Sequence, residues 1–185
     1  GRYWEVESNK DIFKNLSKKG MIDGAYNYIL DGNQNFQVIN DVIDGKEVQF
    51  RRISANEYTR GRNSQKLSDL QYKQKMRIAP SIDDLINNSE IHYNSPLTHD
   101  SKLFKEGFNN YQGKVGIDDN IFRYIVKISK AKNDNIFYDI SLEYLDTKKG
   151  TTEVPSTNST SLLKKVPFSN DNITNSNENV KSSTK

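Results

Sequence analysis

The chain has 185 residues, of which 34% are hydrophobic and 28% charged, and its formal net charge is +3. This length and composition allow one domain with a modest core. The absence of cysteine excludes disulfides and thiolate metal sites. No apolar run approaches the roughly 20 residues that span a bilayer, so no membrane partner is expected. No signal peptide is evident and the chain begins with Gly, so we expect it to be part of a longer protein.

The first half of the chain predicts a short strand, then mostly helices. In order, the predicted elements are a strand near residues 3–6, two short helices between Ser8 and Gly32, a hairpin turning at Asp44-Gly45, and helices capped by Ser54, Ser68 and Ser81. Pro80 closes the helix that Ser68 begins. A polar loop that contains both histidines follows the last of these helices.

The second half predicts an antiparallel sheet. Residues 121–145 alternate as a β-hairpin around Asn133-Asp134-Asn135, with apolar residues on even positions of both arms. If Lys132 faces Ile136, the two even sets, including Tyr138, share one core-facing side. A turn at Asp119-Asn120 adds a third strand, residues 111–117, to the same side. We therefore expect an α+β fold, with N-terminal helices packed on one face of an antiparallel sheet that ends in a three-stranded meander.

The composition changes after Leu145. Residues 146–185 are rich in Ser, Thr, Asn and Lys, with a short apolar stretch only at residues 162–168. So little apolar surface cannot offset the entropy lost on ordering. We expect one α+β domain at residues 1–145 and a disordered tail at 146–185, with a docking patch at 162–168 as one role for the tail.

Positive charge is concentrated between Arg51 and Arg77. Eight basic and two acidic residues lie there, a local charge of +6 that includes five of the seven arginines. The guanidinium fork suits phosphate oxygens, so this cluster favours a nucleic-acid partner. The candidate substrate-binding residues in it are Arg51, Arg52, Lys73 and Arg77. The alternative is a solvated helix face with no ligand.

Several runs of the sequence carry a family resemblance. RRISANEYTRG, YKQKMRIAPS, FNNYQGKVGIDDNIFRYIVKISKAK and NIFYDISLEYL follow the N-terminal helices in this order. Over residues 3–145 this pattern resembles the C-terminal domain of MuF-type phage head-morphogenesis proteins, which also occurs in large polyvalent proteins of phages and mobile elements. The resemblance implies kinship with the barnase, EndoU, colicin and RelE-like superfamily of metal-independent nucleases. It also implies a virion-associated protein, or one delivered to the bacterial cytoplasm.

That kinship places substrate on the sheet face opposite the helices. The polar residues expected there are Arg123, Lys127, Ser129, Asp139, Ser141 and Glu143. Metal-independent RNA cleavage needs a base, an acid and a cation at the phosphate. We expect Arg123 and Lys127 to hold the phosphate, Glu143 or Asp139 to act as base, and His92 to act as acid. The alternative is a surface ion pair between Arg123 and Glu143.

The sequence leaves three functions open. The first is an effector or toxin domain that cleaves or binds RNA, RNA being a more expected partner than DNA, with an immunity protein as a further partner. The second is a non-catalytic virion module that binds DNA or a capsid or portal protein. The third is an ADP-ribosyltransferase toxin, for which no nicotinamide-pocket pattern is found. His92 and His99 lack a convincing third ligand, so neither a metal nor another cofactor is expected.

Overall fold

A computed structural model describes residues 2–38, 47–96, 106–130 and 134–149. Its helices are α1 (Lys18–Asp31), α2 (Arg52–Arg60), α3 (Arg62–Gln65), α4 (Asp69–Arg77) and α5 (Ile82–Asn87), with short 3-10 turns at Ser8–Lys10, Asn33–Asn35 and Ala79–Ser81. Its strands are β1 (Trp4–Glu5), β2 (Val48–Gln49), β3 (Ile91–Ser95), β4 (Phe108–Ile117), β5 (Asn120–Lys130) and β6 (Asn135–Thr147). The chain divides into two compact units, residues 1–117 with 123–142, and residues 118–122 with 143–185.

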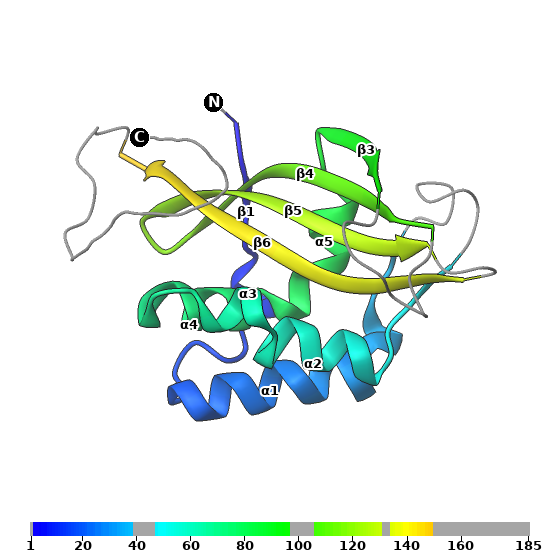
Figure 1. The fold of residues 1–185 in the computed structure, drawn as a ribbon. Helices are drawn as coiled ribbons and strands as arrows, with labels where there is room; N and C mark the ends of the chain where they lie inside the picture. The colour runs from blue at the N-terminus through cyan, green and yellow to red at the C-terminus, as the bar shows by residue number, and fades with distance from the viewer. Residues whose placement is uncertain (1, 39–46, 97–105, 131–133, 150–185) are drawn as a thin grey trace. The chain divides into compact units, whose positions relative to one another are not determined.

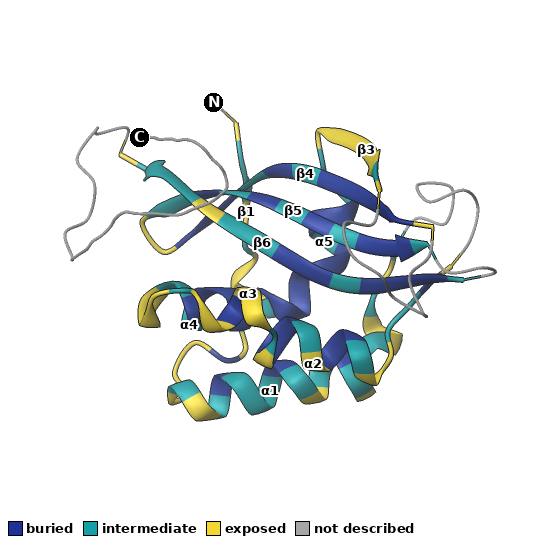
Figure 2. Ribbon diagram, in the orientation of Figure 1, coloured by how far each residue is buried: buried dark blue, intermediate teal, exposed yellow. Residues whose placement is uncertain are grey.

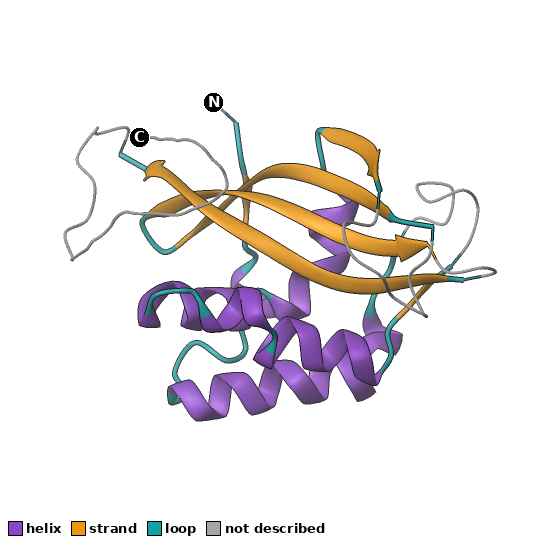
Figure 3. Ribbon diagram, in the orientation of Figure 1, coloured by secondary structure: helices purple, strands orange, loops and turns teal. Residues whose placement is uncertain are grey.

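The first unit has helices on one side of a mixed sheet (Figures 1 and 3). The strand order is β1-β4-β5-β6-β2, and β3 pairs with β4 as well. The central strands β4, β5 and β6 form the expected meander, so the predicted α+β class is confirmed. The sheet is not wholly antiparallel, because β1 runs parallel to β4 and β2 runs parallel to β6.

Capping explains where several helices begin and end. The hydroxyl of Ser17 accepts from the Gly20 N–H at 3.1 Å, and that of Ser68 accepts from the Gln71 N–H at 3.2 Å. These bonds satisfy backbone donors in the first turns of α1 and α4. The predicted Ser68 cap is therefore confirmed, and α1 ends before Gly32 as predicted.

Two predicted helix starts are wrong. No α-helix begins at Ser8, where the chain forms only a 3-10 turn, and Ile12 and Leu16 remain exposed. The helix near Ser54 begins earlier, at Arg52, and the Ser54 hydroxyl accepts from the Arg51 N–H at 3.0 Å. Ser54 thus occupies the third position of the helix and not the cap position before it. The sequence pattern around Ser54 does not distinguish these two positions. The predicted hairpin at residues 44–45, His99 and the 162–168 patch lie outside the described residues.

The strand faces differ from the prediction by one residue in β6. Tyr124 of β5 donates its hydroxyl to the Leu85 carbonyl of α5 at 2.8 Å, so even residues of β5 face the helices, as predicted. In β6, however, odd-numbered Asp139 binds Lys75 of α4 at 2.7 Å. The predicted shared even face is therefore wrong for β6. A slip of one residue reverses every side chain of a strand, and β6 carries apolar residues at both parities (Ile136 and Phe137), so alternation could not fix its face.

The turn between β4 and β5 lies at Asp118-Asp119, one residue before the predicted position. Asp118 has a φ of 53°, in the left-handed region that Asp tolerates better than most residues. The shift keeps the odd-to-even relation of the two strands. Gly113 of β4 lies against the Tyr124 ring, so odd residues of β4 and even residues of β5 share the helix side, as predicted.

Aromatic rings connect the helices to β6. The ring of Phe137 stacks on Phe50 with centroids 5.3 Å apart and contacts Tyr58 of α2 at 5.9 Å. Tyr58 is fully buried and donates its hydroxyl to the Lys75 carbonyl. Such ring pairs contribute beyond their buried area. These contacts form the part of the core between α2, α4 and the helix side of β6, and buried apolar residues of α1, α5, β4 and β5 extend it.

The second unit comprises residues 118–122 and 143–149 in the part of the chain that the structure describes. The Lys148 N–H donates to the Asp119 carbonyl at 2.8 Å, and the rings of Phe122 and Tyr144 meet edge to face at 6.0 Å. Because β5 and β6 both continue into this unit, the division into one domain at 1–145 and a tail at 146–185 stays a prediction.

Replacing Gly113 by Ala tests the contact between β4 and Tyr124. A Cβ atom at this position would lie 2.6 Å from the Tyr124 hydroxyl oxygen, closer than real contacts allow. We expect Gly113→Ala to lower the free energy of unfolding by about 1–3 kcal/mol through overpacking, measured by urea denaturation. Gly20→Ala is the control, because its nearest neighbour is the side chain of exposed Leu16 at 3.2 Å. An equal loss of unfolding free energy in both variants would contradict the close contact between Gly113 and the Tyr124 ring.

Candidate nucleic-acid interface

The basic cluster between Arg51 and Arg77 is largely neutralised by nearby carboxylates. Five of its eight basic residues form ion pairs, namely Arg51 with Asp134, Arg60 with Asp23, Lys73 with Asp69, Lys75 with Asp139 and Arg77 with Asp11. Ion pairing reduces the positive potential that a phosphate backbone would meet. The local charge seen in the sequence therefore overstates the charge this region presents.

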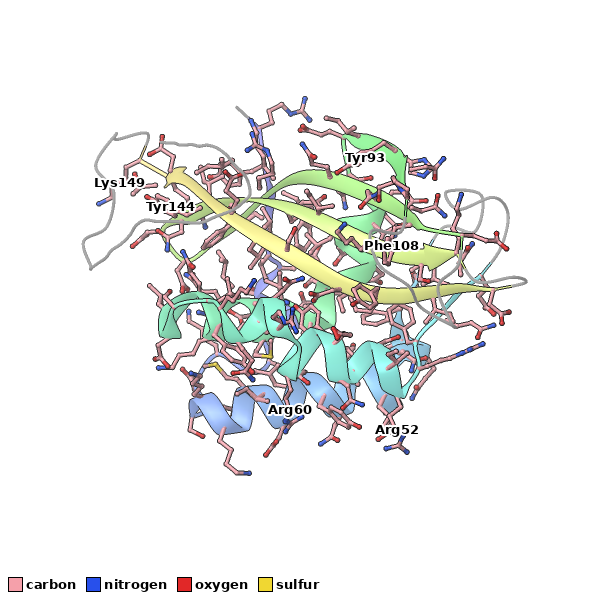
Figure 4. The ribbon with its side chains drawn as sticks, viewed as in Figure 1. Arg52, Arg60, Tyr93, Phe108, Tyr144 and Lys149 are labelled. Atoms are coloured by element: carbon pink, nitrogen blue, oxygen red, sulfur yellow. The ribbon has the colours of Figure 1, made fainter. Side chains whose placement is uncertain are left out.

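The predicted substrate-binding residues of this cluster do not share one surface. The buried guanidinium of Arg77 binds both carboxylate oxygens of Asp11, at 3.1 and 2.6 Å. Arg51 is exposed and binds Gln49 as well as Asp134. Exposed Arg52 lies on the helix layer in Figure 4, whereas Tyr93 and Phe108 lie on the sheet. Their role in binding substrate stays a prediction.

Lys75 and Asp139 form a buried ion pair in the first unit. Their side chains are 1% and 3% exposed, and Nζ lies 2.7 Å from the carboxylate. The same ammonium donates to the Ser64 hydroxyl at 2.7 Å and lies 4.9 Å from the centre of the Tyr58 ring. Asn63 donates to the other carboxylate oxygen at 3.2 Å. Asp139 was expected on the face away from the helices, and this placement is wrong because its charge is satisfied by α3 and α4.

Removing one partner of this pair should be costly. Lys75→Met leaves the Asp139 carboxylate buried without its cation, so we expect a loss of about 3–5 kcal/mol in the free energy of unfolding, measured by urea denaturation. The double variant Lys75→Met with Asp139→Leu should recover most of it, because no charge remains buried.

Lys73→Met is the matched control for this loss. Its exposed pair with Asp69 should contribute only about 0–1 kcal/mol. Equal losses for Lys73→Met and Lys75→Met would show that the buried pair has no special role in stability.

The sheet face away from the helices carries a row of polar and aromatic residues. The Lys130 N–H donates to the Gly107 carbonyl at 2.9 Å, which sets these two residues opposite each other in the antiparallel pair. Counting three residues along each strand brings Lys127 opposite Asn110. Asn110 in turn pairs with Tyr93 of β3. Opposite residues share a face, so Tyr93, Asn110 and Lys127 form a row across three strands.

Phe108 and Tyr138 complete this surface, which we call the Lys127 face. The Lys127 ammonium lies 5.2 Å from the centre of the Phe108 ring, and the Phe108 and Tyr138 rings are 5.3 Å apart. Tyr93 at the end of the row is 38% exposed on β3, which is almost wholly exposed, unlike buried β4 (Figure 2). Among the described residues, no helix covers this face and no hydrogen bond or ion pair reaches the Lys127 ammonium.

The environment alters two titrating groups on the Lys127 face. Burial lowers the pKa of Lys127, and the more distant charge of Asp139 only partly opposes this effect. Burial, followed by the negative charges of Glu57 and Asp139, raises the pKa of Tyr138 to about 12. Tyr138 precedes Asp139, which faces α4, and its ring meets Phe108, so its expected place on the core-facing side is wrong. Its side chain is half-buried and its hydroxyl bonds to Glu57 of α2. The phenol keeps its proton at neutral pH and can donate it in a hydrogen bond.

Two of the three predicted catalytic residues, His92 and Arg123, lie on opposite sides of the sheet of the first unit. His92 pairs with Tyr111 of β4, and their rings stack at 4.4 Å with planes 5° apart. Tyr111 has the parity of Gly113, so exposed His92 lies on the helix side of the sheet. Arg123 precedes helix-facing Tyr124 and lies on the opposite side. Glu143 is exposed and belongs to the second unit, and the catalytic role of all three stays a prediction.

No group of three or more His, Asp or Glu side chains that could hold a metal ion occurs in the described parts of the chain. None of the described helices has both the length and the apolar character needed to cross a bilayer.

Comparison with protein families gives a match over most of the first unit. The model of a family described as large polyvalent protein-associated domain 3 matches residues 17–138, more than half of the chain. The chain belongs to this family. The expected link to polyvalent proteins is thereby confirmed, and kinship with MuF-type domains and nucleases stays a prediction. Neither the curated proteins nor the solved structures contain a significant match.

The family match spans every residue of the Lys127 face, ending at Tyr138. The sequence predicts Lys127 as a substrate-binding residue of this polyvalent protein-associated domain. It does not single out Tyr93, Phe108 or Asn110 as site residues. The available signal was weak: Phe108 and Asn110 share a parity at the start of β4, two residues apart. Tyr93 lay in a segment interpreted as a loop, because exposed β3 shows no alternation of apolar and polar residues.

The lowered pKa of Lys127 predicts a pH-dependent effect on stability. A cation whose pKa is lower in the folded state destabilises the fold while it is protonated. The free energy of unfolding therefore rises as the pH increases from the lowered pKa of Lys127 in the folded protein to the ordinary value of 10.5. We expect Lys127→Met to raise the melting temperature at pH 7, and this gain to shrink as the pH approaches 10. Lys66→Met on the exposed surface is the control. A gain independent of pH, or a loss at pH 7, would contradict the prediction.

Proposed function

We propose that this large polyvalent protein-associated domain is an effector domain, borne by a phage or mobile element, that binds single-stranded RNA on its Lys127 face. The observation that carries the proposal is the setting of Lys127. Its half-buried ammonium lies against the Phe108 ring, beyond which is Tyr138, with no carboxylate bonded to it in the described structure. A cation desolvated in this way gains most from an added anion.

Aromatic rings beside the cation support nucleic acid over a simple anion. Proteins that bind single strands combine basic groups for the backbone with rings on which bases stack. Tyr93 is an exposed ring in the same row as Lys127, and Arg123 of β5 lies on the same side of the sheet. Unstacked RNA bases are the usual targets of such platforms.

A metal-independent endoribonuclease activity is the finer form of this proposal. It is supported by the resemblance to MuF-type domains and their nuclease superfamily, and by a sheet whose described helices all lie on one side. In this form Arg123 holds the phosphate, with Glu143 as base and His92 as acid.

The placement of His92 favours a second candidate. His92 and Arg123 lie on opposite sides of the sheet, so they do not meet at one phosphate in this arrangement. A non-catalytic virion module, which binds DNA or a capsid or portal protein, does not require His92 and Arg123 to reach the same phosphate. It predicts binding without turnover.

Binding of a labelled single-stranded RNA of about a dozen nucleotides, a length typical of such sites, tests the proposal. We expect fluorescence anisotropy to show saturable binding whose affinity falls with salt. Lys127→Met should weaken it about tenfold, as should Tyr93→Ala through lost stacking. Lys66→Met removes the same charge elsewhere and should change affinity by less than about twofold. Absence of binding at low salt, or equal losses for both lysine variants, would overturn the proposal.

The same samples separate the two candidates. Incubation with total RNA in the presence of a chelator should give cleavage that disappears in Arg123→Ala and His92→Ala if the domain is a metal-independent nuclease. Salt-dependent binding of duplex DNA without cleavage of RNA would instead favour the virion module.

A further inference from the structure

Two buried polar atoms beside Lys127 lack hydrogen-bond partners in the described structure. They are the hydroxyl oxygen of Ser129 and the side-chain oxygen of Asn110. Ser129 is 0% exposed and Asn110 is 1% exposed. Buried polar atoms are nearly always hydrogen-bonded, and an unsatisfied one costs free energy. Two such atoms next to an unpaired ammonium therefore need an explanation.

The amide of Asn110 is fixed by its other end. Its Nδ2 donates to the Ser95 hydroxyl at 2.8 Å and to the Tyr93 carbonyl at 3.3 Å, both on β3. With both donor protons used, the amide presents Oδ1 as an acceptor. β3 lies on one side of β4, and the register sets Asn110 opposite Lys127 of β5 on the other side.

Ser129 lies on the same face of β5 as Lys127. The register that sets Gly107 opposite Lys130 also sets Phe108 opposite Ser129. Two residues along a strand span roughly 7 Å, and opposite residues have Cβ atoms about 5 Å apart. Ser129, Lys127 and Asn110 are thus within reach of a single group the size of a ribose phosphate.

We infer that Lys127, Ser129 and Asn110 form a ribose-phosphate subsite that distinguishes RNA from DNA. In this subsite the ammonium and the Ser129 hydroxyl donate to phosphate oxygens. Asn110 Oδ1 accepts from the ribose 2′-hydroxyl, the one donor that DNA lacks. The Lys127 ammonium lies 5.2 Å from the centre of the Phe108 ring, and Phe108 stands opposite Ser129 in the register. The inference rests on the proposed RNA binding and assigns its selectivity to named atoms.

Three matched oligonucleotides of one sequence test the subsite on the full chain, namely RNA, DNA and 2′-O-methyl RNA. We expect the wild-type protein to bind RNA about tenfold more tightly than DNA. The 2′-O-methyl strand, which keeps the ribose but cannot donate, should bind as weakly as DNA. Ser129→Ala should weaken RNA and DNA about equally, by several fold, since it removes a phosphate contact. Asn110→Ala should abolish the preference for RNA.

Thermal unfolding of the variants separates a binding role from a structural one. Ser129→Ala deletes a hydroxyl without a partner, so its melting temperature should equal or exceed that of the wild type. Unchanged RNA affinity in Ser129→Ala, or equal wild-type affinity for all three oligonucleotides, would overturn the subsite and leave RNA binding intact. If Asn110→Ala fails to fold, the 2′-O-methyl measurement on wild type still decides. Absence of binding to any strand would overturn the proposed function itself.

Discussion

The arrangement of the sheet depends on the buried ion pair between Lys75 and Asp139. A lysine that is 1% exposed on α4 must have a carboxylate beside it, because an unpaired buried ammonium costs several kcal/mol. A slip of β6 by one residue would turn Asp139 away and leave both charges without a partner. The pair therefore selects one register, although its net contribution to stability relative to apolar residues is small or unfavourable. In this register the adjacent Tyr138 lies on the other side of the strand.

The same ion pair explains why no carboxylate of β6 in the first unit contacts Lys127 on the Lys127 face. With Asp139 held against α4, no carboxylate of β6 in the first unit stands in hydrogen-bond contact with Lys127, and only a weaker attraction at a distance remains. Most cations of the basic cluster have carboxylates in contact. Binding free energy comes from groups whose own protein leaves them incompletely satisfied. In the first unit, the half-buried lysine and the two polar atoms beside it meet that condition.

How much the sequence predicts depends on whether a local pattern decides the outcome. In β5 the apolar residues fall mostly on even positions and that set does face the helices, and in α4 Ser68 is a local cap, so both were predictable. In β6 the apolar residues also fall mostly on even positions, but its face is decided by Lys75, which is 64 residues away in the sequence. For the site, Lys127 could be predicted as a basic residue on a strand. Its lack of a bonded carboxylate could not, because that depends on where every acidic residue lies in three dimensions.

The chemistry of the Lys127 face favours holding an anion over cleaving a bond. Cleavage of RNA needs a base, an acid and a cation within hydrogen-bond reach of one phosphate. His92 is separated from Arg123 by the sheet itself. Tyr138, whose pKa is raised to about 12, keeps its proton at neutral pH and is therefore a poor base. A lysine against an aromatic ring, next to a hydroxyl and an oriented amide oxygen, supplies donors and an acceptor of fixed direction, which is what selective association requires. Catalysis on this face would need a base brought from elsewhere in the chain.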